Sequence, residues 1–341
     1  MTTSTTLPTA PPAALPRVRL DWTPLALAPL LMLLAFPLVG SPSTWLTLTI
    51  AGLAMGMIIF VVSSGLTLVF GLMDVLNFGH GAFIALGAYV AASVLLPMAG
   101  WVEADSLAQN LAVFALAIAA AMVAAGAVGL FFERVVVRPV YGQHLKQILI
   151  TMGGMIVAEQ LIKAIWGPET IALQVPTTFR GAVLLGDAAI EKYRLIAMVL
   201  GLVIFIAMLL LLNRTRIGLL IRAGVENREM VEALGYRIRR LFIGVFVVGA
   251  GLAGLGGVLW GLYQQNITAA IGAQVNVLIF IVIIIGGLGS TTGCFVGALL
   301  VGLMANYTGF LFPKVALFSN ILLMMLILLW RPQGLFPVAR R

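Results

Sequence analysis

The chain has 341 residues, of which 62% are hydrophobic and 9% are charged, and its formal net charge is +8. Ordinary soluble domains hold about 45–50% apolar and about 25% charged residues, so a soluble fold of this length could not bury so much apolar surface. The positive charge does not indicate a nucleic-acid-binding protein, because that function needs a basic soluble domain and the sequence offers no segment long enough for one.

Residues 1–22 are rich in threonine, proline and alanine and contain no hydrophobic core ahead of Arg17. They predict a disordered cytoplasmic tail and not a cleaved signal peptide. The region 23–335 is expected to form one transmembrane domain, followed by a short basic cytoplasmic tail at 336–341. The single cysteine, Cys294, excludes an internal disulfide.

Hydrophobic runs of about 20 residues, long enough to cross about 30 Å of hydrocarbon, follow one another along this domain. Such runs predict helices, since the strands of a membrane β-barrel are alternating segments of about 10 residues. We therefore expect an all-α, polytopic integral membrane protein with about ten spans, at 24–40, 46–70, 79–98, 107–132, 147–166, 195–213, 241–263, 273–288, 293–312 and 315–330. The run at 273–288 is short and ends in glycines, so a re-entrant or broken helix is an alternative there.

The positions of lysine and arginine predict the orientation, because positively charged loops stay on the cytoplasmic side of the membrane. With the N-terminus inside, most of the 20 lysines and arginines fall in cytoplasmic segments, chiefly between residues 213 and 242. Both termini are therefore expected to be cytoplasmic, which an even number of spans requires.

Polar residues within the runs are candidates for a solute pathway or gate, because polar groups at membrane depth are costly and usually face the interior of a helix bundle. The structural alternative is that the serines and threonines bond to their own backbone and that the histidine ties a turn. The candidates are Ser63, Ser64 and Thr67 in the second run, Asn77 and His80 at the turn that follows it, and Gln264 and Gln265 at the outer end of the seventh run.

Small residues recur every fourth position in two runs, which places them on one face of each helix. They are Ala117, Ala121, Ala125 and Gly129, and Gly249, Ala253, Gly257 and Gly261. Static packing is favoured for these faces over a seam that slides during gating.

Glu159 and Lys163 lie four residues apart in the fifth run, with the glutamate nearer the N-terminus, which is the favourable order for an ion pair within a helix. We expect the pair to neutralise itself. An ion-driven carrier would more often leave a carboxylate unpaired.

The segment 214–240 is much longer than a connection between spans needs, and it predicts a short helix that binds another protein. Gly224 is expected to precede this helix and Gly235 to stop it, while Glu226 and Glu229 favour its N-terminal end. Acidic residues alternate with Arg228, which suits a protein groove better than a lipid surface. The candidate coupling residues are Gly224, Glu226, Glu229, Met230, Glu232, Ala233, Leu234 and Gly235, with Val231 on the face of Met230 and Leu234.

Four segments together resemble the branched-chain amino-acid ABC transporter permease family and its urea- and amide-transporting relatives. They are GLTLVFGLMDVLNFGHGAFIALGAY (65–89), RAGVENREMVEALG (222–235), GAGLAGLGGVLWG (249–261) and IIIGGLGSTTGCFVGALLVG (283–302). The resemblance implies a multi-pass permease of a bacterial inner membrane, importing branched-chain amino acids or a related small polar solute. It also implies a second permease subunit, two cytoplasmic ATP-binding subunits and a periplasmic solute-binding protein, with residues 226–235 seated on an ATP-binding subunit.

The chain is not expected to be an enzyme or to hold a cofactor. A phosphate-binding loop needs Gly-Lys-Ser/Thr, but the lysines follow Leu145, Ile162, Glu191 and Pro313, so ATP and magnesium would be bound by partner subunits. The histidines, His80 and His144, are far apart and have no metal-ligand spacing, so no metal site and no catalytic residue is predicted. An ion-gradient-driven secondary transporter remains the main alternative.

Overall fold

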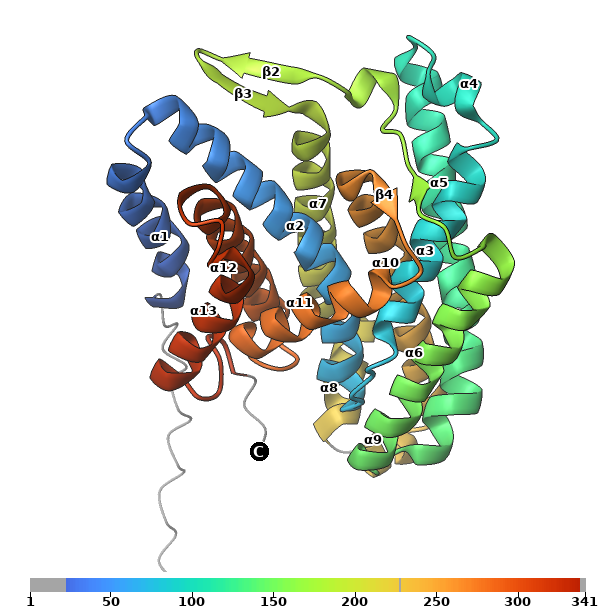
Figure 1. The fold of residues 1–341 in the computed structure, drawn as a ribbon. Coiled ribbons are helices and arrows are strands. Elements are labelled where there is room, and N and C mark those ends of the chain that lie inside the picture. The colour runs from blue at the N-terminus through green and yellow to red at the C-terminus, as the bar shows by residue number, and fades with distance from the viewer. Residues whose placement is uncertain (1–22, 227, 338–341) are drawn as a thin grey trace, which may run out of the picture.

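The apolar runs form helices, because each backbone N–H and C=O within lipid must find its partner in the same segment. The computed structural model describes residues 23–226 and 228–337, so the predicted tail at 1–22 and residues 338–341 of the predicted tail at 336–341 lie outside it. The long helices are α1 (Thr23–Val39), α2 (Pro42–Met73), α3 (His80–Leu95), α5 (Leu107–Phe132), α6 (His144–Trp166), α7 (Lys192–Arg214), α10 (Ile238–Gln264), α11 (Ile271–Gly286), α12 (Thr291–Leu311) and α13 (Ala316–Trp330) (Figure 1).

Six helices of the described chain are long and apolar enough to cross a membrane: α2, α5 with its extension to Val140, α6, α7, α10 and α12. Four shorter apolar helices complete the set: α1, α3, α11 and the end of α13. The prediction of a mostly helical membrane protein is confirmed, while the count of about ten spans and the cytoplasmic termini stay predictions.

Helix α2 is the centre of the bundle and runs obliquely through it (Figure 1). The most apolar stretch of α2 is 89% buried, against 11% in α6 and 17% in α7. Ser41 caps its N-terminus by accepting a hydrogen bond from the backbone of Thr44, and Asp74 ends it in the left-handed conformation, with a φ of 53°. Helices α7, α10 and α12 surround α2. Helix α6 does not belong to this group, and most of its surface faces outward.

Two of the shorter helices begin inside the bundle and not at its surface. The ring Nε2 of His80, the first residue of α3, lies 3.3 Å from the carbonyl oxygen of Val62 in α2. Gly81 of α3 packs its backbone directly against Gly272, at the start of α11. With 16 residues each, α3 and α11 are about 24 Å long, shorter than the hydrocarbon thickness of about 30 Å.

The predicted small-residue faces are buried and bring backbones into contact. Ala117, Ala121 and Ala125 of α5 are fully buried, and a Cβ on Gly254 of α10 would lie 2.7 Å from the Ala121 carbonyl oxygen. On other faces of α10, a Cβ on Gly249 would lie 2.8 Å from the Val69 side chain of α2. Helix α10 therefore packs tightly on α5 and α2 at once.

The chain is mostly helical, as the predicted all-α fold class requires, and it also contains two small antiparallel sheets at one end of the bundle. Strand β1 (Ile171–Ala172) pairs with β4 (Asn266–Ile267), and β2 (Ala182–Leu185) forms a hairpin with β3 (Ala188–Glu191). The hairpin projects at the end opposite α8 (Arg216–Glu226) and α9 (Arg228–Ala233) (Figure 1). These strands of two to four residues are too short to leave a periodic pattern in the sequence.

The tight contacts of α10 predict a steep penalty for adding a single methyl group. In Gly257→Ala the new Cβ would overlap the carbonyl oxygen of Ile84, which is backbone and cannot rotate away. Overpacking of this kind costs about 1–3 kcal/mol or more. We expect the apparent melting temperature of the detergent-solubilised chain to fall by several degrees. The matched variant is Gly153→Ala, because Gly153 of α6 has nothing within 4 Å of the added Cβ, and its melting temperature should not fall.

Candidate functional site

The charged segment 214–240 is helical on both sides of residue 227, over a longer stretch than the short helix that the sequence predicted. Helix α8 (Arg216–Glu226) runs through Gly224, and α9 (Arg228–Ala233) follows it. The prediction that Gly224 precedes the helix is wrong: Gly224 lies inside α8, and a Cβ there would come within 2.7 Å of the Ile238 side chain, so its small size serves packing. Gly235 follows the end of α9 with a φ of +86°, and its N–H donates to the Glu232 carbonyl. This is the geometry of a glycine that stops a helix at its C-terminus.

The apolar residues of α9 divide between the chain's own interior and its surface. Val231 is buried beside Leu220 and Ile238, so it holds α9 against α8 and α10. Met230 and Leu234 are 60% and 70% exposed. Glu232, Ala233 and Gly235 are also exposed, whereas the side chains of Glu226 and Glu229 lie outside the described residues. The segment therefore offers a small apolar surface at the end of the bundle.

A second constellation holds the loop between α2 and α3. The N–H of Phe78 donates to Thr151 Oγ1 of α6 over 3.1 Å, and the carbonyl of Phe78 accepts from Asn276 Nδ2 of α11 over 2.9 Å. The Phe78 ring stacks on Phe280, with 4.3 Å between the ring centroids. One residue of the loop is thus tied to two helices distant in sequence.

The neighbouring gate candidates have structural partners. Asn77 is buried and accepts the Gly79 N–H through Oδ1, although its Nδ2 has no partner among the described residues. His80 is 1% exposed, and its ring approaches the backbone of α2 at Val62, a contact of the structural kind that the sequence offered as the alternative to a gate.

The gate candidates in α2 and those at the C-terminal end of α10 differ in burial and in hydrogen-bond partners. Ser64 and Thr67 donate to the carbonyls of Val61 and Ser63, confirming their expected backbone bonds. Ser63 is fully buried, and its Oγ has no partner among the described residues. The structure places His80 against the part of α2 that carries Ser63 and Ser64, whereas Gln264 and Gln265 are exposed at the end of α10, far from these serines in sequence.

The predicted ion pair is present. Lys163 Nζ lies 2.7 Å from Glu159 Oε1, and the two side chains are 36% and 24% exposed. Glu159 also lines a shallow groove, whose other lining residues include Gly81 of α3 and Gly272 of α11. The pair therefore sits on an open face of α6 beside the point where α3 and α11 begin.

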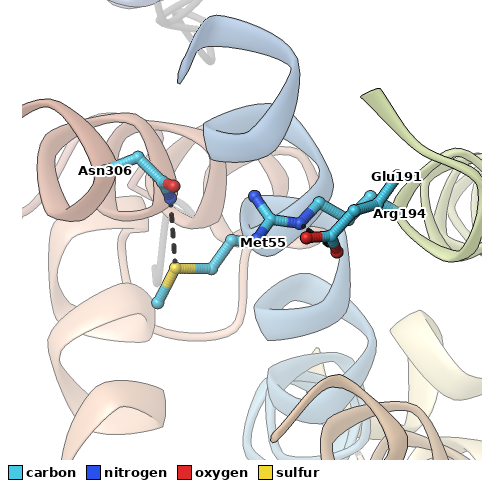
Figure 2. Close-up of polar contacts among 4 residues, drawn as sticks. All are labelled: Met55, Glu191, Arg194 and Asn306. Carbon is cyan, nitrogen blue, oxygen red and sulfur yellow. Dashed lines mark hydrogen bonds and ion pairs between the residues drawn. The ribbon is translucent and has the colours of Figure 1, made fainter. Parts of the chain in front are cut away.

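Sequence reasoning missed several polar contacts between elements. Figure 2 shows Asn306 of α12 donating to Met55 Sδ of α2 over 3.3 Å, and Arg194 of α7 paired with Glu191 over 2.9 Å. The Arg194 guanidinium also lies 5.5 Å from the centroid of the Tyr263 ring. A lone asparagine in an apolar run, such as Asn276 or Asn306, could have indicated the hydrogen bonds between helices, because an amide at membrane depth needs a partner.

Together these features define a multi-pass helical membrane protein whose charges lie mostly at the ends of its bundle. Among the described residues, no group of three or more His, Cys, Asp or Glu side chains could hold a metal ion. Residues 48–330 match the family model described as the permease component of branched-chain amino acid transport systems, and the chain belongs to that family.

Curated relatives agree with this assignment. The chain is 30% identical over 296 residues to the high-affinity branched-chain amino acid transport system permease protein BraD of Pseudomonas aeruginosa, covering 83% of this chain and 93% of the relative. It is 29% identical to the corresponding protein LivH of Escherichia coli, covering 83% and 92%, and 27% identical to LivM of the same organism, covering 91% and 74%. No solved structure matches the chain significantly.

The double attachment of Phe78 predicts that either bond matters for stability. Thr151→Val and Asn276→Leu keep the approximate side-chain size but leave the N–H or the carbonyl of Phe78 without its partner, which costs about 1–3 kcal/mol when the group is buried. We expect lower melting temperatures for both variants. Thr47→Val is the control, since Thr47 bonds within α2, to the Ser43 carbonyl; an equal loss in this variant would contradict a special role for the Phe78 contacts.

Proposed function

We propose that the chain is a permease subunit of a bacterial ABC importer for branched-chain amino acids or a related small polar solute, such as urea, an amide or a small organic acid. The observation that carries the proposal is the α8–α9 segment, which exposes Met230 and Leu234 at one end of a helical permease. Exposed apolar side chains on a short, partly anchored helix suit docking into a groove of a second protein. The solute class is that of the related branched-chain amino acid permeases BraD and LivH.

ATP and magnesium would be bound by two cytoplasmic partner subunits, because the sequence contains no Gly-Lys-Ser/Thr loop. Both chain termini would then be cytoplasmic, the subunit would lie in the inner membrane, and a periplasmic protein would deliver the solute. The secondary-carrier alternative differs in one respect: such a protein would transport without an ATP-binding partner and stop when the ion gradient collapses.

We also propose that the α6 face around Glu159 and Lys163 meets a second permease subunit and the solute pathway. The pair is 24% and 36% exposed in the single chain, and a partly exposed ion pair facing lipid would be costly. Helix α6 is also the least buried of the six long spans, at 11%. A protein or a water-filled pathway on this face would remove the contact between charge and hydrocarbon.

The docking role of α9 predicts a selective effect of Leu234→Asp. A carboxylate at a position that is 70% exposed does not disturb the chain's own core, but it would be buried unpaired in the groove of an ATP-binding subunit. We expect at least a tenfold loss of co-purified ATP-binding subunits and of radiolabelled uptake, with leucine, urea and small amides as test solutes. A tenfold loss corresponds to about 1.4 kcal/mol of binding.

The matched control is Leu184→Asp, since Leu184 is 71% exposed on the β2–β3 hairpin at the other end of the bundle. It should retain the ATP-binding subunits. Full co-purification and uptake by Leu234→Asp would contradict the docking role, and purification from native membranes without any ATP-binding subunit would contradict the ABC importer.

The proposed permease interface can be tested by site-specific photo-crosslinking. Ile156 is 60% exposed and lies one turn before Glu159 on the same face of α6. A photoreactive residue at position 156 should give a permease–permease adduct. The same residue at Val123 of α5, which is 72% exposed, should give none. Adducts at position 123 alone would place the second permease on a different face.

A further inference from the structure

Five arginines converge on one cavity at the end of the bundle that carries α9. Two come from the end of α5, which continues through a π-helical turn (Glu133–Val137) and a 3-10 turn (Arg138–Val140), and three come from the entry to α10. The cavity has a volume of about 700 Å³, which lies within the usual range of small-molecule sites. Its arginines are Arg134, Arg138, Arg237, Arg239 and Arg240.

The cavity carries a large excess of positive charge. Glu232 is the acidic residue of the lining, and none of the five arginines lies within 4 Å of a carboxylate in the part of the chain that the structure describes. The N-terminal end of α10 adds its positive dipole at the same place. The five arginines are exposed side chains that line one space, so an anion bound there would interact favourably with several of them at once.

The geometry of the guanidinium groups determines which kind of anion fits this cavity best. Their planar forks donate two parallel hydrogen bonds to phosphate oxygens, and several of them around one cavity favour a phosphate over a single carboxylate. A second, adjoining cavity of about 240 Å³ shares Arg138 and Arg239 and is lined also by Tyr141 and by the buried carboxylate of Glu133. This carboxylate disfavours an anion there, so the larger cavity is the place for the phosphate group.

The position of the cavity indicates that the phosphate belongs to a lipid. The helix that begins at Leu107 and ends at Val140 has 34 residues, or about 51 Å, whereas a bilayer with its headgroups is about 40–45 Å thick. Its last turns therefore reach the headgroup level. Phe131 and Val135, on either side of Arg134, are 62% and 54% exposed, so an apolar surface for acyl chains adjoins the arginines.

We propose that this arginine cavity binds the phosphodiester headgroup of an anionic phospholipid. The lipid would neutralise the arginines of α5 and α10 together and lie directly beside Glu232 of α9. The proposal does not depend on the identity of the transported solute.

The test compares two double variants of the full chain, purified with the subunits that accompany it. Arg134→Gln with Arg239→Gln removes two cavity arginines. Arg214→Gln with Arg216→Gln removes the same charge from exposed positions that do not line the cavity. Native mass spectrometry after exchange into phosphatidylglycerol or phosphatidylcholine measures retained lipid, and inorganic phosphate is added as a third probe.

We expect the wild type and the Arg214/Arg216 variant to retain phosphatidylglycerol, and the Arg134/Arg239 variant to retain at least tenfold less. Inorganic phosphate alone should not displace the lipid. If the wild type retained phosphatidylcholine as well as phosphatidylglycerol, the proposal would be overturned whatever the variants retain. A cavity variant that keeps its lipid but loses its ATP-binding subunits would assign the arginines to protein docking, and displacement by free phosphate would assign them to a soluble anion.

Discussion

Close approach of helix backbones is the constraint on which the rest of this structure depends. Lipid provides little hydrophobic force between helices, so van der Waals packing must hold them together. This packing is closest at small residues such as glycine, where two backbones can touch. Gly65 of α2 meets Gly249 of α10, and Gly87 of α3 meets Gly254 of the same helix. Helix α10 is thereby fixed to its neighbours along most of its length, and the remaining elements are arranged around this block.

Such packing also explains how two short helices can begin inside the bundle. A helix start leaves N–H groups without intrahelical partners. At α3 the preceding loop supplies partners, since the N–H of His80 donates to the Asn77 carbonyl and the N–H of Ala82 donates to the Gly79 carbonyl. The backbone of Phe78 in the same loop is bound by Thr151 of α6 and Asn276 of α11, which gives these isolated polar residues a structural role in otherwise apolar runs.

The sequence predicted the helical runs, the buried small-residue faces, the Glu159–Lys163 pair and the stop at Gly235, because each depends on local spacing. It did not predict that α8 continues through Gly224, since the close contact with Ile238 arises only when α8 folds against α10. Nor did it find the partner of Asn276 or the arginine cavity. Residues 134 and 239 are more than a hundred positions apart, and no periodicity within one run can show that they line one space.

The same packing determines which helices would move if a partner protein displaced α9. Val231 is buried between α9, α8 and the entry to α10, so a displacement of α9 reaches α10 directly. Since α10 is packed backbone to backbone on α2 and α3, we expect these helices to move together. Helix α6 is attached less extensively: 11% of its span is buried, and its close contacts are those of Thr151 with the loop before α3 and of Gly154 with Phe132. Relative motion should therefore concentrate along the face of α6 that carries the ion pair, where a neighbouring subunit or a pathway would respond to it.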